Sequence, residues 1–331
     1  MLTKVAIIGA GAISREHIAA FKRIQNVEVS LVVSRDPARA RDVANIAGAA
    51  WSTKLENAFS PGIDAVDICQ RNPLHASLTI AAAQHGKHIL VEKPVALNLE
   101  DFDRMVAATR ENKVSLMVGQ TLRFQPVHRE FKKALSEGKI GQLRVLHSSR
   151  YAGYLWPGSW RAWQMDENIS GGHLRHNGAH PLDFAIWFFG EKPARVFTRT
   201  FKSWAAGMPT PDGFNISLRF EDGSLALLEF SYALREKGDS YIRLLAVGEK
   251  GSLLHDSENE SRVRGNGANL PSPATEDAMY YELAHWVKML HGEEEPVVRL
   301  EQVRHTLLAT LAAHQSYQTG RAVTIGENGI E

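Results

Sequence analysis

The first part of the chain alternates short apolar runs with segments of helical spacing. Between the runs, apolar residues recur every three or four positions over about ten residues, as in amphipathic helices. Strands separated by helices of this length form parallel sheets that helices cover on both faces. The runs predicted as strands are residues 5–8, 27–33, 65–69, 88–91 and 114–118.

Three of the intervening helices begin at residues that favour helix N-termini. Asp36 precedes Pro37 and Asn72 precedes Pro73, so each pair matches an N-cap and a first helical position. Asn98 is expected to cap the helix that follows the fourth run. These signals agree with the alternation of strands and helices.

The pattern changes after Gly119. A helix over 127–137 is followed by apolar segments that tight turns join in pairs, and short turns between consecutive strands indicate antiparallel pairing. Residues 256–274 are predicted to be a loop, and helices over 278–290 and 301–318 close the chain. The second half is therefore predicted to be an antiparallel sheet with helices on one side. Its predicted strands are residues 143–149, 216–220, 225–232, 241–247 and 252–255.

A glycine-rich turn, Gly9-Ala10-Gly11-Ala12-Ile13-Ser14, joins the first strand to the first helix. In a dinucleotide-binding turn the first glycine permits the tight turn and the second lets the backbone approach a pyrophosphate. The helix N-terminus then attracts the anion. Ser14 stands at the third glycine of that pattern. Because a strand precedes the turn and a helix follows it, we predict nucleotide contacts at Gly9, Gly11, Ala12 and Ile13.

The fold class that follows is α/β with two domains. Residues 1–120 are predicted to form a Rossmann domain with a parallel sheet. Residues 121–331 are predicted to form an α+β domain with a mostly antiparallel, open-faced sheet. A length of 331 residues and a hydrophobic content of 44% suffice for two packed cores.

Charge and cysteine content narrow the classes of partner. The 38 basic and 37 acidic residues nearly balance, so there is no electrostatic case for nucleic acid or an anionic membrane surface. The single cysteine, Cys69, allows no disulfide framework and fits a reducing cytoplasm. The first strand begins at the N-terminus and no apolar run approaches a membrane span, so we expect a cytoplasmic protein without a signal peptide.

The end of the second strand bears on the choice between NAD and NADP. An acidic residue there normally binds the adenosine ribose and selects NAD. This chain has Ser34 and Arg35, with Arg39 one turn further on. A hydroxyl beside a guanidinium suits a 2′-phosphate, which a carboxylate would repel. We therefore predict a preference for NADP over NAD. Two alternatives are that Asp36 binds the ribose instead, and that Arg35 and Arg39 are surface residues in contact with solvent only.

Lys93 follows the fourth strand, in the sequence Glu92-Lys93-Pro94. Ligands of open parallel sheets bind at the carboxyl ends of the strands. A lysine at that position can hold a substrate hydroxyl and stabilise oxyanion character during hydride transfer. An ordinary surface lysine is the alternative interpretation.

The order of motifs along the chain favours the functional interpretation. After the glycine-rich turn come Asn72-Pro73-Leu74-His75, Gly86-Lys87-His88, Glu92-Lys93-Pro94, Arg123-Phe124-Gln125-Pro126, Gly171-Gly172 and His180-Pro181-Leu182-Asp183. Together they resemble the Gfo/Idh/MocA family over nearly the whole chain. The resemblance implies an NAD(P)-dependent oxidoreductase that acts on sugars, inositols or related polyols. It also implies pairing of open-faced sheets into a homodimer or homotetramer.

The resemblance assigns roles to individual residues. It implies that Lys93 contacts the substrate and that His180, at the start of the second domain's first long helix, is the acid/base. Asn72, His75, Glu92 and Lys93 join the expected cofactor contacts.

The chain departs from the family pattern in two places. Gln70-Arg71 stand where the family often has Thr-Pro, near the nicotinamide end. His176 stands where many members carry aspartate, four residues before His180, a spacing that predicts one helical face for both histidines. His176 is expected to hold a substrate hydroxyl or, if charged, to lower the pKa of His180.

The mechanism that follows is a hypothesis for the oxidative direction. His180 takes the proton of the substrate hydroxyl, for which an imidazole with a pKa of about 6.5 is suited. Lys93 stabilises the developing alkoxide as an ammonium. Residues expected near the substrate, with packing or an interface as the alternative, are Arg123, Tyr151, Tyr154, Trp156, Trp160, Arg161, Trp163 and Arg175. Asp183 is also expected there, with orientation of His180 or capping of a neighbouring turn as the alternative.

Other classes of function are weighed against this one. His176, His180 and Asp183 have the donor types of a metal site, but Asn177 replaces the glutamate of zinc-protease motifs, so we expect no metal. A non-catalytic nucleotide-binding regulator is disfavoured because Lys93 and His180 are both present. A redox-assisted glycosidase or epimerase that retains its cofactor would show no net change in reduced nicotinamide.

Overall fold

A computed structural model describes residues 2–152, 162–202, 211–232, 234, 240–257, 260–265, 268–269, 277–327 and 329–331. The chain divides into two compact units. The first comprises Met1–Gln125 with Glu276–Val303, and the second Pro126–Thr275 with Arg304–Glu331. The first unit therefore includes a segment from near the C-terminus, whereas the sequence analysis divides the chain once, at residue 120.

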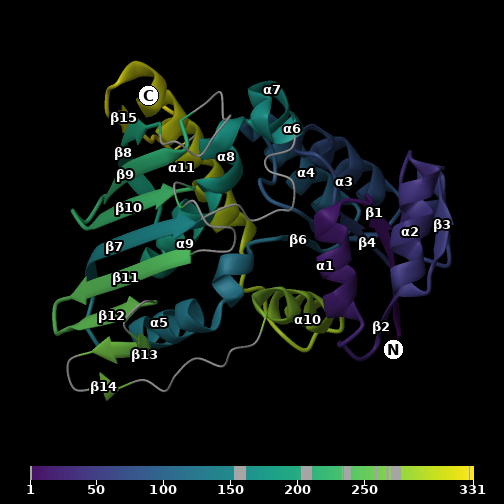
Figure 1. Ribbon diagram of the computed structural model, residues 1–331, viewed down its shortest axis with the longest axis horizontal. Coiled ribbons are helices and arrows are strands. Elements are labelled where there is room, and N and C mark those ends of the chain that lie inside the picture. The colour runs from purple at the N-terminus through teal and green to yellow at the C-terminus, as the bar shows by residue number, and fades with distance from the viewer. Residues whose placement is uncertain are drawn as a thin grey trace. The chain divides into compact units, whose positions relative to one another are not determined.

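The first unit contains a six-stranded parallel sheet in the order β3-β2-β1-β4-β5-β6. This confirms the predicted Rossmann sheet, and β3 is an edge strand that the apolar pattern did not reveal. The strands are β1 (Thr3–Ile8), β2 (Val27–Val33), β3 (Ala50–Ser52), β4 (Ala65–Ile68), β5 (His88–Val91) and β6 (Leu116–Val118). The helices between them are α1 (Ala12–Phe21), α2 (Pro37–Ala47), α3 (His75–Gln84) and α4 (Leu99–Glu111). Figure 1 shows this arrangement.

The helix starts follow from side-chain caps. Asp36 accepts hydrogen bonds from the backbone N–H groups of Ala38 and Arg39, and Asn98 accepts one from Asp101, so both predicted N-caps are confirmed. The prediction for Asn72 is wrong. Residues Asn72–Leu74 form a 3-10 turn, α3 begins only at His75, and Asn72 is buried instead of capping.

A further helix, α10 (Ala278–Leu290), packs on α1 within the first unit (Figure 1). The ring of Trp286 lies 6.0 Å from that of Phe21, and the Arg23 guanidinium lies 4.4 Å from the centre of the Tyr280 ring. The face of α1 that points away from α2 is therefore covered by residues from near the end of the chain.

The second unit is built on a nine-stranded sheet in the order β14-β13-β12-β11-β7-β10-β9-β8-β15. Only β7 and β10 pair in parallel; the other neighbours are antiparallel, as the sequence predicted for most of this sheet. The strands are β7 (Leu143–Ala152), β8 (Pro193–Phe201), β9 (Gly213–Phe220), β10 (Leu225–Ser231), β11 (Ser240–Gly248), β12 (Ser252–Asp256), β13 (Glu260–Gly265), β14 (Ala268–Asn269) and β15 (Val323–Thr324). The predicted loop over 256–274 is corrected, since β13 and β14 lie within it.

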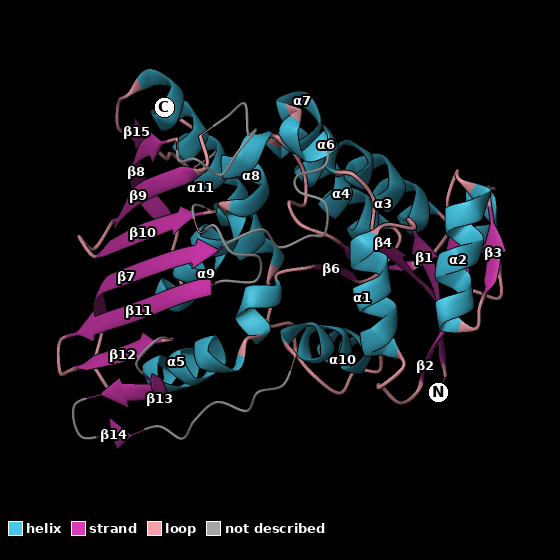
Figure 2. Ribbon diagram, viewed as in Figure 1, coloured by secondary structure: helices cyan, strands magenta, loops and turns pink. Residues whose placement is uncertain are grey.

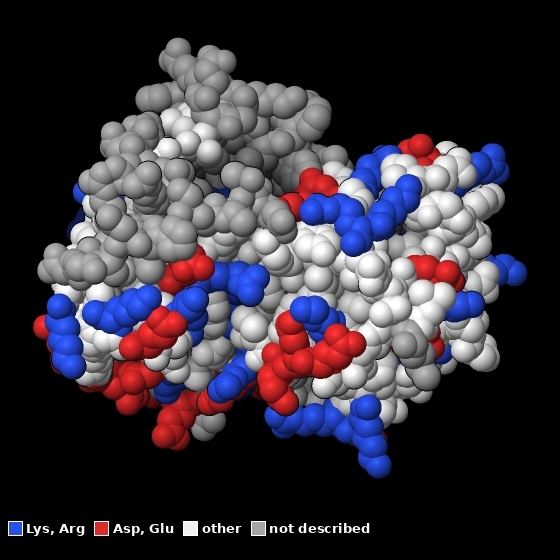
Figure 3. Space-filling view, turned by 90° about the horizontal axis from the view of Figure 1, so that it is seen from below, with Lys and Arg blue, Asp and Glu red and all other residues white. Residues whose placement is uncertain are grey.

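The helices of the second unit lie on one face of this sheet (Figure 2), and α9 packs on β7 and β10. They are α5 (Pro126–Ser136), α6 (Ala162–Met165), α7 (Glu167–Ser170), α8 (Gly172–Asn177), α9 (Ala179–Phe189) and α11 (Leu300–Thr319). On the molecular face drawn in Figure 3, the described acidic and basic residues are interspersed. None of the described helices combines the length and apolar character needed to cross a membrane.

Candidate active site

The turn after β1 has the geometry that its glycines predict. Gly9 adopts φ +128°, and a Cβ there would lie 2.3 Å from the carbonyl oxygen of Cys69, so only glycine fits. Gly11 has φ −95° and precedes α1, and a Cβ on it would meet no described atom within 4 Å. Open space at Gly11 is what close approach of a pyrophosphate requires.

No side-chain cap or first-turn acidic residue of α1 competes with an anion at the N-terminus of this helix. No side chain caps it, and its first turn contains no acidic residue, so its positive end is unopposed within the helix. Ala12 and Ile13, both predicted cofactor contacts, are the first two helical residues. Ser14, at the third glycine position, is fully buried and donates to the carbonyl of Gly11 over 2.8 Å. The residues present therefore fit a dinucleotide.

The contacts at the end of β2 distinguish between the two candidate sites for the adenosine ribose, Ser34 with Arg35 and Asp36. Ser34 is half-buried and Arg35 is exposed. Asp36 accepts two helix N–H groups and also pairs with the Arg39 guanidinium over 3.2 Å. Its carboxylate oxygens are therefore committed to α2, which leaves Ser34 and Arg35 as the better candidates at this strand end.

His75 ties two strand-end loops together. Its ring is fully buried, with Nδ1 2.9 Å from the carbonyl oxygen of Pro94 and Nε2 3.0 Å from that of Gln70. Burial lowers the pKa of this imidazole, which favours the neutral ring. Both nitrogens face the backbone, so His75 shapes the loops, and we no longer count it among the cofactor contacts.

Lys93 is the second residue after β5 and is half-buried. Its backbone N–H donates to the Glu92 carboxylate over 3.2 Å. Glu92 is buried and its other oxygen, Oε1, lies 3.2 Å from Nε2 of His17 on α1. The Glu92 carboxylate therefore points to α1, and Glu92 is reassigned from a cofactor contact to an internal partner.

Sequence reasoning missed the cluster to which Glu92 belongs. His17 is fully buried and places Nδ1 2.8 Å from Asp67 on β4. Glu282 of α10 is also fully buried and accepts a hydrogen bond from the Thr121 hydroxyl over 2.9 Å. The available signal was His17 itself, a polar residue on the buried face of α1.

The charges in this cluster follow from its pairs. Burial alone would lower the pKa of His17, but Asp67 outweighs it and raises the pKa well above the ordinary value. Burial alone would raise the pKa of Glu92, and the ion pair with His17 lowers it. Burial and then Glu92 raise the pKa of Glu282 to about 8. His17 is thus a cation and Glu92 an anion, and Glu282 is mainly protonated at neutral pH.

The same cluster contains the one described group of three residues with the donor types of a metal site. Donor atoms of His17, Asp67 and Cys69 lie within 4.8 Å of one another. The His17–Asp67 pair already uses two of these donors, and burial raises the pKa of the Cys69 thiol, which keeps it neutral. The arrangement therefore reads as a hydrogen-bonded network.

The predicted acid/base histidines lie in the second unit. His176 is near the end of α8, and His180 is the second residue of α9, so the predicted helix start at His180 is correct. The chain between them passes through Gly178, so the single continuous helix expected for the two histidines is in fact two. The His176 ring meets that of Trp163 edge-on, with centroids 5.3 Å apart.

Arg175 belongs to a polar chain in the same region. Its guanidinium lies 3.2 Å from Nδ1 of His314 on α11, and Nε2 of His314 lies 2.8 Å from the Glu167 carboxylate. Burial lowers the pKa of Arg175, and the nearby Glu167 opposes that effect. The half-buried Arg175 is thus oriented by α11.

Two predicted substrate residues have structural positions instead. Arg123 is fully buried, and its guanidinium donates to the carbonyl of Val297 and to Gln302. Asp183 is buried and accepts a hydrogen bond from Thr306 over 3.1 Å. We therefore do not keep Arg123 and Asp183 as substrate contacts.

The remaining residues predicted near the substrate are four aromatic residues and Arg161, of which Tyr151 lies in the part of the chain that the structure describes. Tyr151 lies on β7 with its ring 6.5 Å from that of Tyr241, and burial followed by a hydrogen bond to Glu229 raises its pKa to about 12. The predictions for Tyr154, Trp156, Trp160 and Arg161 fall outside the described residues.

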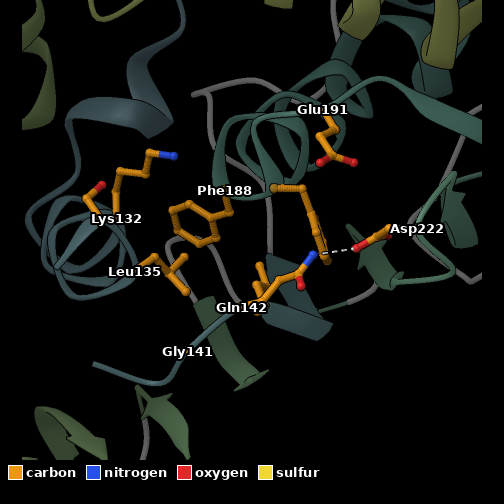
Figure 4. Close-up of a pocket in the computed structure, with 10 residues that line it drawn as sticks. Lys132, Leu135, Gly141, Gln142, Phe188, Glu191 and Asp222 are labelled. Carbon is orange, nitrogen blue, oxygen red and sulfur yellow. Dashed lines mark hydrogen bonds between the residues drawn. The ribbon is translucent and has the colours of Figure 1, made fainter. Parts of the chain in front are cut away.

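A cavity of about 220 Å³ also lies in the second unit, between α5, the start of β7 and the end of α9 (Figure 4). Phe188 forms part of its wall, and Gln142 donates to Asp222 beside it over 3.0 Å. The Lys132 ammonium donates to the carbonyl of Trp187. Because these polar groups already have partners and no predicted site residue lines the cavity, we assign it no ligand.

Comparison with known proteins agrees with the two units. Residues 3–120 match the model of the oxidoreductase family with an NAD-binding Rossmann fold, and residues 128–254 match the GFO/IDH/MocA C-terminal domain. The chain is 28% identical to 1,5-anhydro-D-fructose reductase from Ensifer adhaerens, over 99% of this chain and 100% of that protein. It is 30% identical to scyllo-inositol 2-dehydrogenase (NADP(+)) from Bacillus subtilis (strain 168), over 87% and 88%.

A solved structure shows the same fold over the full length. The crystal structure of a probable dehydrogenase from Thermotoga maritima superimposes with a TM-score of 0.83 at 25% identity, covering 97% of this chain and 99% of that one. Both domain models, the full-length relatives and this structure agree. The chain is a member of the Gfo/Idh/MocA family of oxidoreductases, with an NAD(P)-binding Rossmann domain.

Proposed function

We propose that this protein is an NADP-preferring dehydrogenase or reductase of a sugar, inositol or related polyol. The observation that carries the proposal is the presence, in one unit, of an open nucleotide turn at Gly11 after β1 and of Lys93 beyond the carboxyl end of β5, two strands away in the same parallel sheet. The names of the relatives, a scyllo-inositol dehydrogenase and an anhydrofructose reductase, support the substrate class.

The cofactor would be held by the β1–α1 turn, with its 2′-phosphate beside Ser34 and Arg35. When bound, the nicotinamide ring supplies the acceptor or donor of hydride. Lys93 donates a hydrogen bond to the reacting oxygen of the substrate and stabilises its negative charge in the transition state. His180 removes the hydroxyl proton during oxidation and returns it during reduction. His176 and Arg175 hold further hydroxyl groups.

The first experiment is a screen for turnover. Purified protein is mixed with NADP⁺ or NAD⁺ and a panel of inositols, aldoses and anhydrosugars, and reduced nicotinamide is followed by absorbance. Lys93→Met should abolish turnover of any substrate found while the Kd for NADP⁺ stays within about twofold of wild type, since loss of one charged contact in the transition state costs at least about a hundredfold in rate. Lys22→Met, an exposed lysine at the end of α1, is the matched control. Full activity in Lys93→Met would refute the role of Lys93.

The cofactor preference has its own test. Ser34→Asp places a carboxylate where we expect the 2′-phosphate, so NADP⁺ affinity should fall at least about tenfold and NAD⁺ affinity should rise or stay constant. Calorimetric titration of both nucleotides measures this. Equal losses for NADP⁺ and NAD⁺ would show that Ser34 lies elsewhere relative to the adenosine ribose.

The assembly and location that we propose are a homo-oligomer in the cytoplasm. The exposed Leu227 on β10 and Phe201 on β8 support a sheet face that another subunit covers, and the single buried cysteine supports a reducing compartment.

A further inference from the structure

His17 lies at the centre of a polar chain that crosses the Rossmann unit and ends at Lys93. Its Nδ1 is 2.8 Å from Asp67 on β4, and its Nε2 is 3.2 Å from Oε1 of Glu92. The other oxygen of Glu92 accepts the backbone N–H of Lys93. Three successive contacts thus connect β4, through His17 of α1, to the residue after Glu92.

The surroundings of the Glu92 carboxylate leave it little freedom. A Cβ on Gly119, at the end of β6, would lie 3.0 Å from Oε1 of Glu92, so the space for this carboxylate depends on the absence of a side chain there. Glu282 of α10 is the second carboxyl group near it, and Cys69 lies 3.6 Å from the His17 ring. The Glu92 carboxylate is therefore confined between His17 on one side and Gly119 on the other.

Such a chain is costly if its only purpose is stability. A buried ion pair gains little over well-packed apolar residues, because desolvation offsets the attraction. Buried polar contacts are, in contrast, often used to fix the direction of a functional group that they touch. The chain here ends on the backbone of the lysine that the proposed function places against the substrate.

We propose that His17 is a positioning residue, which fixes the Glu92 carboxylate between α1 and the Lys93 backbone and thereby sets the position of the Lys93 ammonium. The inference rests on the proposed function for the role of Lys93, but the link from His17 to Lys93 can be measured without a substrate.

Asparagine and glutamine at position 17 separate geometry from charge. Both are neutral, but the Asn amide reaches the place of Nδ1, beside Asp67, and the Gln amide reaches the place of Nε2, beside Glu92. His17→Gln therefore keeps a donor on Glu92, whereas His17→Asn releases Glu92 toward the nearby Lys93 ammonium. Loss of the imidazolium raises the pKa of Lys93 in both variants, and release of the carboxylate raises it further in His17→Asn.

The readout is the pKa of Lys93, taken from the pH dependence of its ¹³C-dimethyl resonance after reductive methylation and assigned with Lys93→Arg. We expect the pKa of Lys93 to be lowest in the wild type, higher in His17→Gln and highest in His17→Asn. The pKa values of the two variants should differ by at least about 0.5 unit. Equal pKa values of Lys93 in the two variants would overturn the inference. The His85→Gln and His85→Asn pair, on the exposed end of α3, should leave the Lys93 resonance unchanged.

A further variant, Gly119→Ala, and a turnover assay of Lys93→Met complete the test. If His17→Asn does not fold, Gly119→Ala displaces Glu92 with every charge retained, and an unmoved Lys93 resonance in that variant overturns the inference. Lys93→Met is assayed alongside for polyol turnover. Full turnover by Lys93→Met would refute the proposed role of Lys93 against the substrate while leaving the His17 link standing, and loss of turnover with equal Lys93 pKa values in the His17 pair would refute only the link.

Discussion

Gly9→Ala and Gly11→Ala should affect different properties, although the two glycines lie in one turn. The first should lower the stability of the fold, and the second should weaken nucleotide binding. A Cβ at Gly9 would meet the Cys69 carbonyl oxygen at 2.3 Å on a backbone with φ +128°. Holding a non-glycine residue in such a region costs about 1–3 kcal/mol, and relief of the contact must also shift the turn or the end of β4. We expect Gly9→Ala to lower the free energy of unfolding by about 3 kcal/mol or more.

Gly11→Ala should leave the stability nearly unchanged. Its Cβ enters open space at an ordinary φ of −95°. The reduced freedom of the unfolded chain stabilises the fold by about 0.4–1 kcal/mol, and alanine is a worse N-cap than glycine by a similar amount. The same methyl group occupies the approach of the pyrophosphate, so the Kd for NADP⁺ should rise at least about tenfold, or 1.4 kcal/mol.

Urea unfolding with and without NADP⁺ measures both effects. At a hundred times the wild-type Kd, the nucleotide should stabilise the wild type by about 2.7 kcal/mol and Gly11→Ala by about 1.4 kcal/mol. Gly9→Ala should be less stable even without nucleotide. Equal losses of stability in Gly11→Ala and Gly9→Ala would contradict the open space assigned to Gly11. Wild-type affinity of Gly11→Ala for NADP⁺ would contradict the approach of the pyrophosphate to this residue.

Two further predictions concern buried polar groups. The pKa of Glu282 is raised from 4.5 to about 8, so the stability it contributes is full below pH 4.5 and is lost as the pH rises through about 8. Glu282→Gln should therefore gain stability relative to the wild type over that range in urea titrations, and a pH-independent difference would contradict the assignment. Arg123→Met leaves the Val297 carbonyl and Gln302 without their buried donor and should cost about 2–5 kcal/mol without changing the Kd for NADP⁺. A stable variant with an altered KM for a polyol would return Arg123 to the substrate site.

Local patterns predicted the elements whose signals are local. The Rossmann strands are continuous apolar runs because both faces of a parallel sheet are buried, and Asp36 and Asn98 cap helices through contacts two or three residues away. The strands that were missed are very short or polar, so no apolar pattern reveals them. β3 is a three-residue edge strand with an exposed Trp51, and β13 is a polar segment, Glu260–Gly265, that extends the sheet from β12.

The candidate site shows the same division. Gly9, Gly11 and Lys93 stand at strand ends, where topology alone indicates ligand contacts. The partners in the charged cluster could not be predicted in this way: His17 was a local signal, but Glu282 meets Thr121 across 161 residues and no periodicity predicts such a pairing. Arg123 illustrates the opposite error: a family motif marked the residue, and only its burial beside Val297 and Gln302 revealed a structural role.

The return of α10 to the first unit has a consequence for synthesis on the ribosome. The Thr3 hydroxyl lies 2.9 Å from Nε2 of His291, a contact that spans 288 residues, and Trp286 covers Phe21. Domains generally fold as they emerge, starting from the N-terminus. This nucleotide-binding unit, although encoded first, reaches its final packing only after residue 303 has left the exit tunnel. Residues 126–275 of the second unit are therefore synthesised before the first unit can close. A nascent chain stopped at residue 125 would lack Trp286 and expose the face of α1 that carries Phe21.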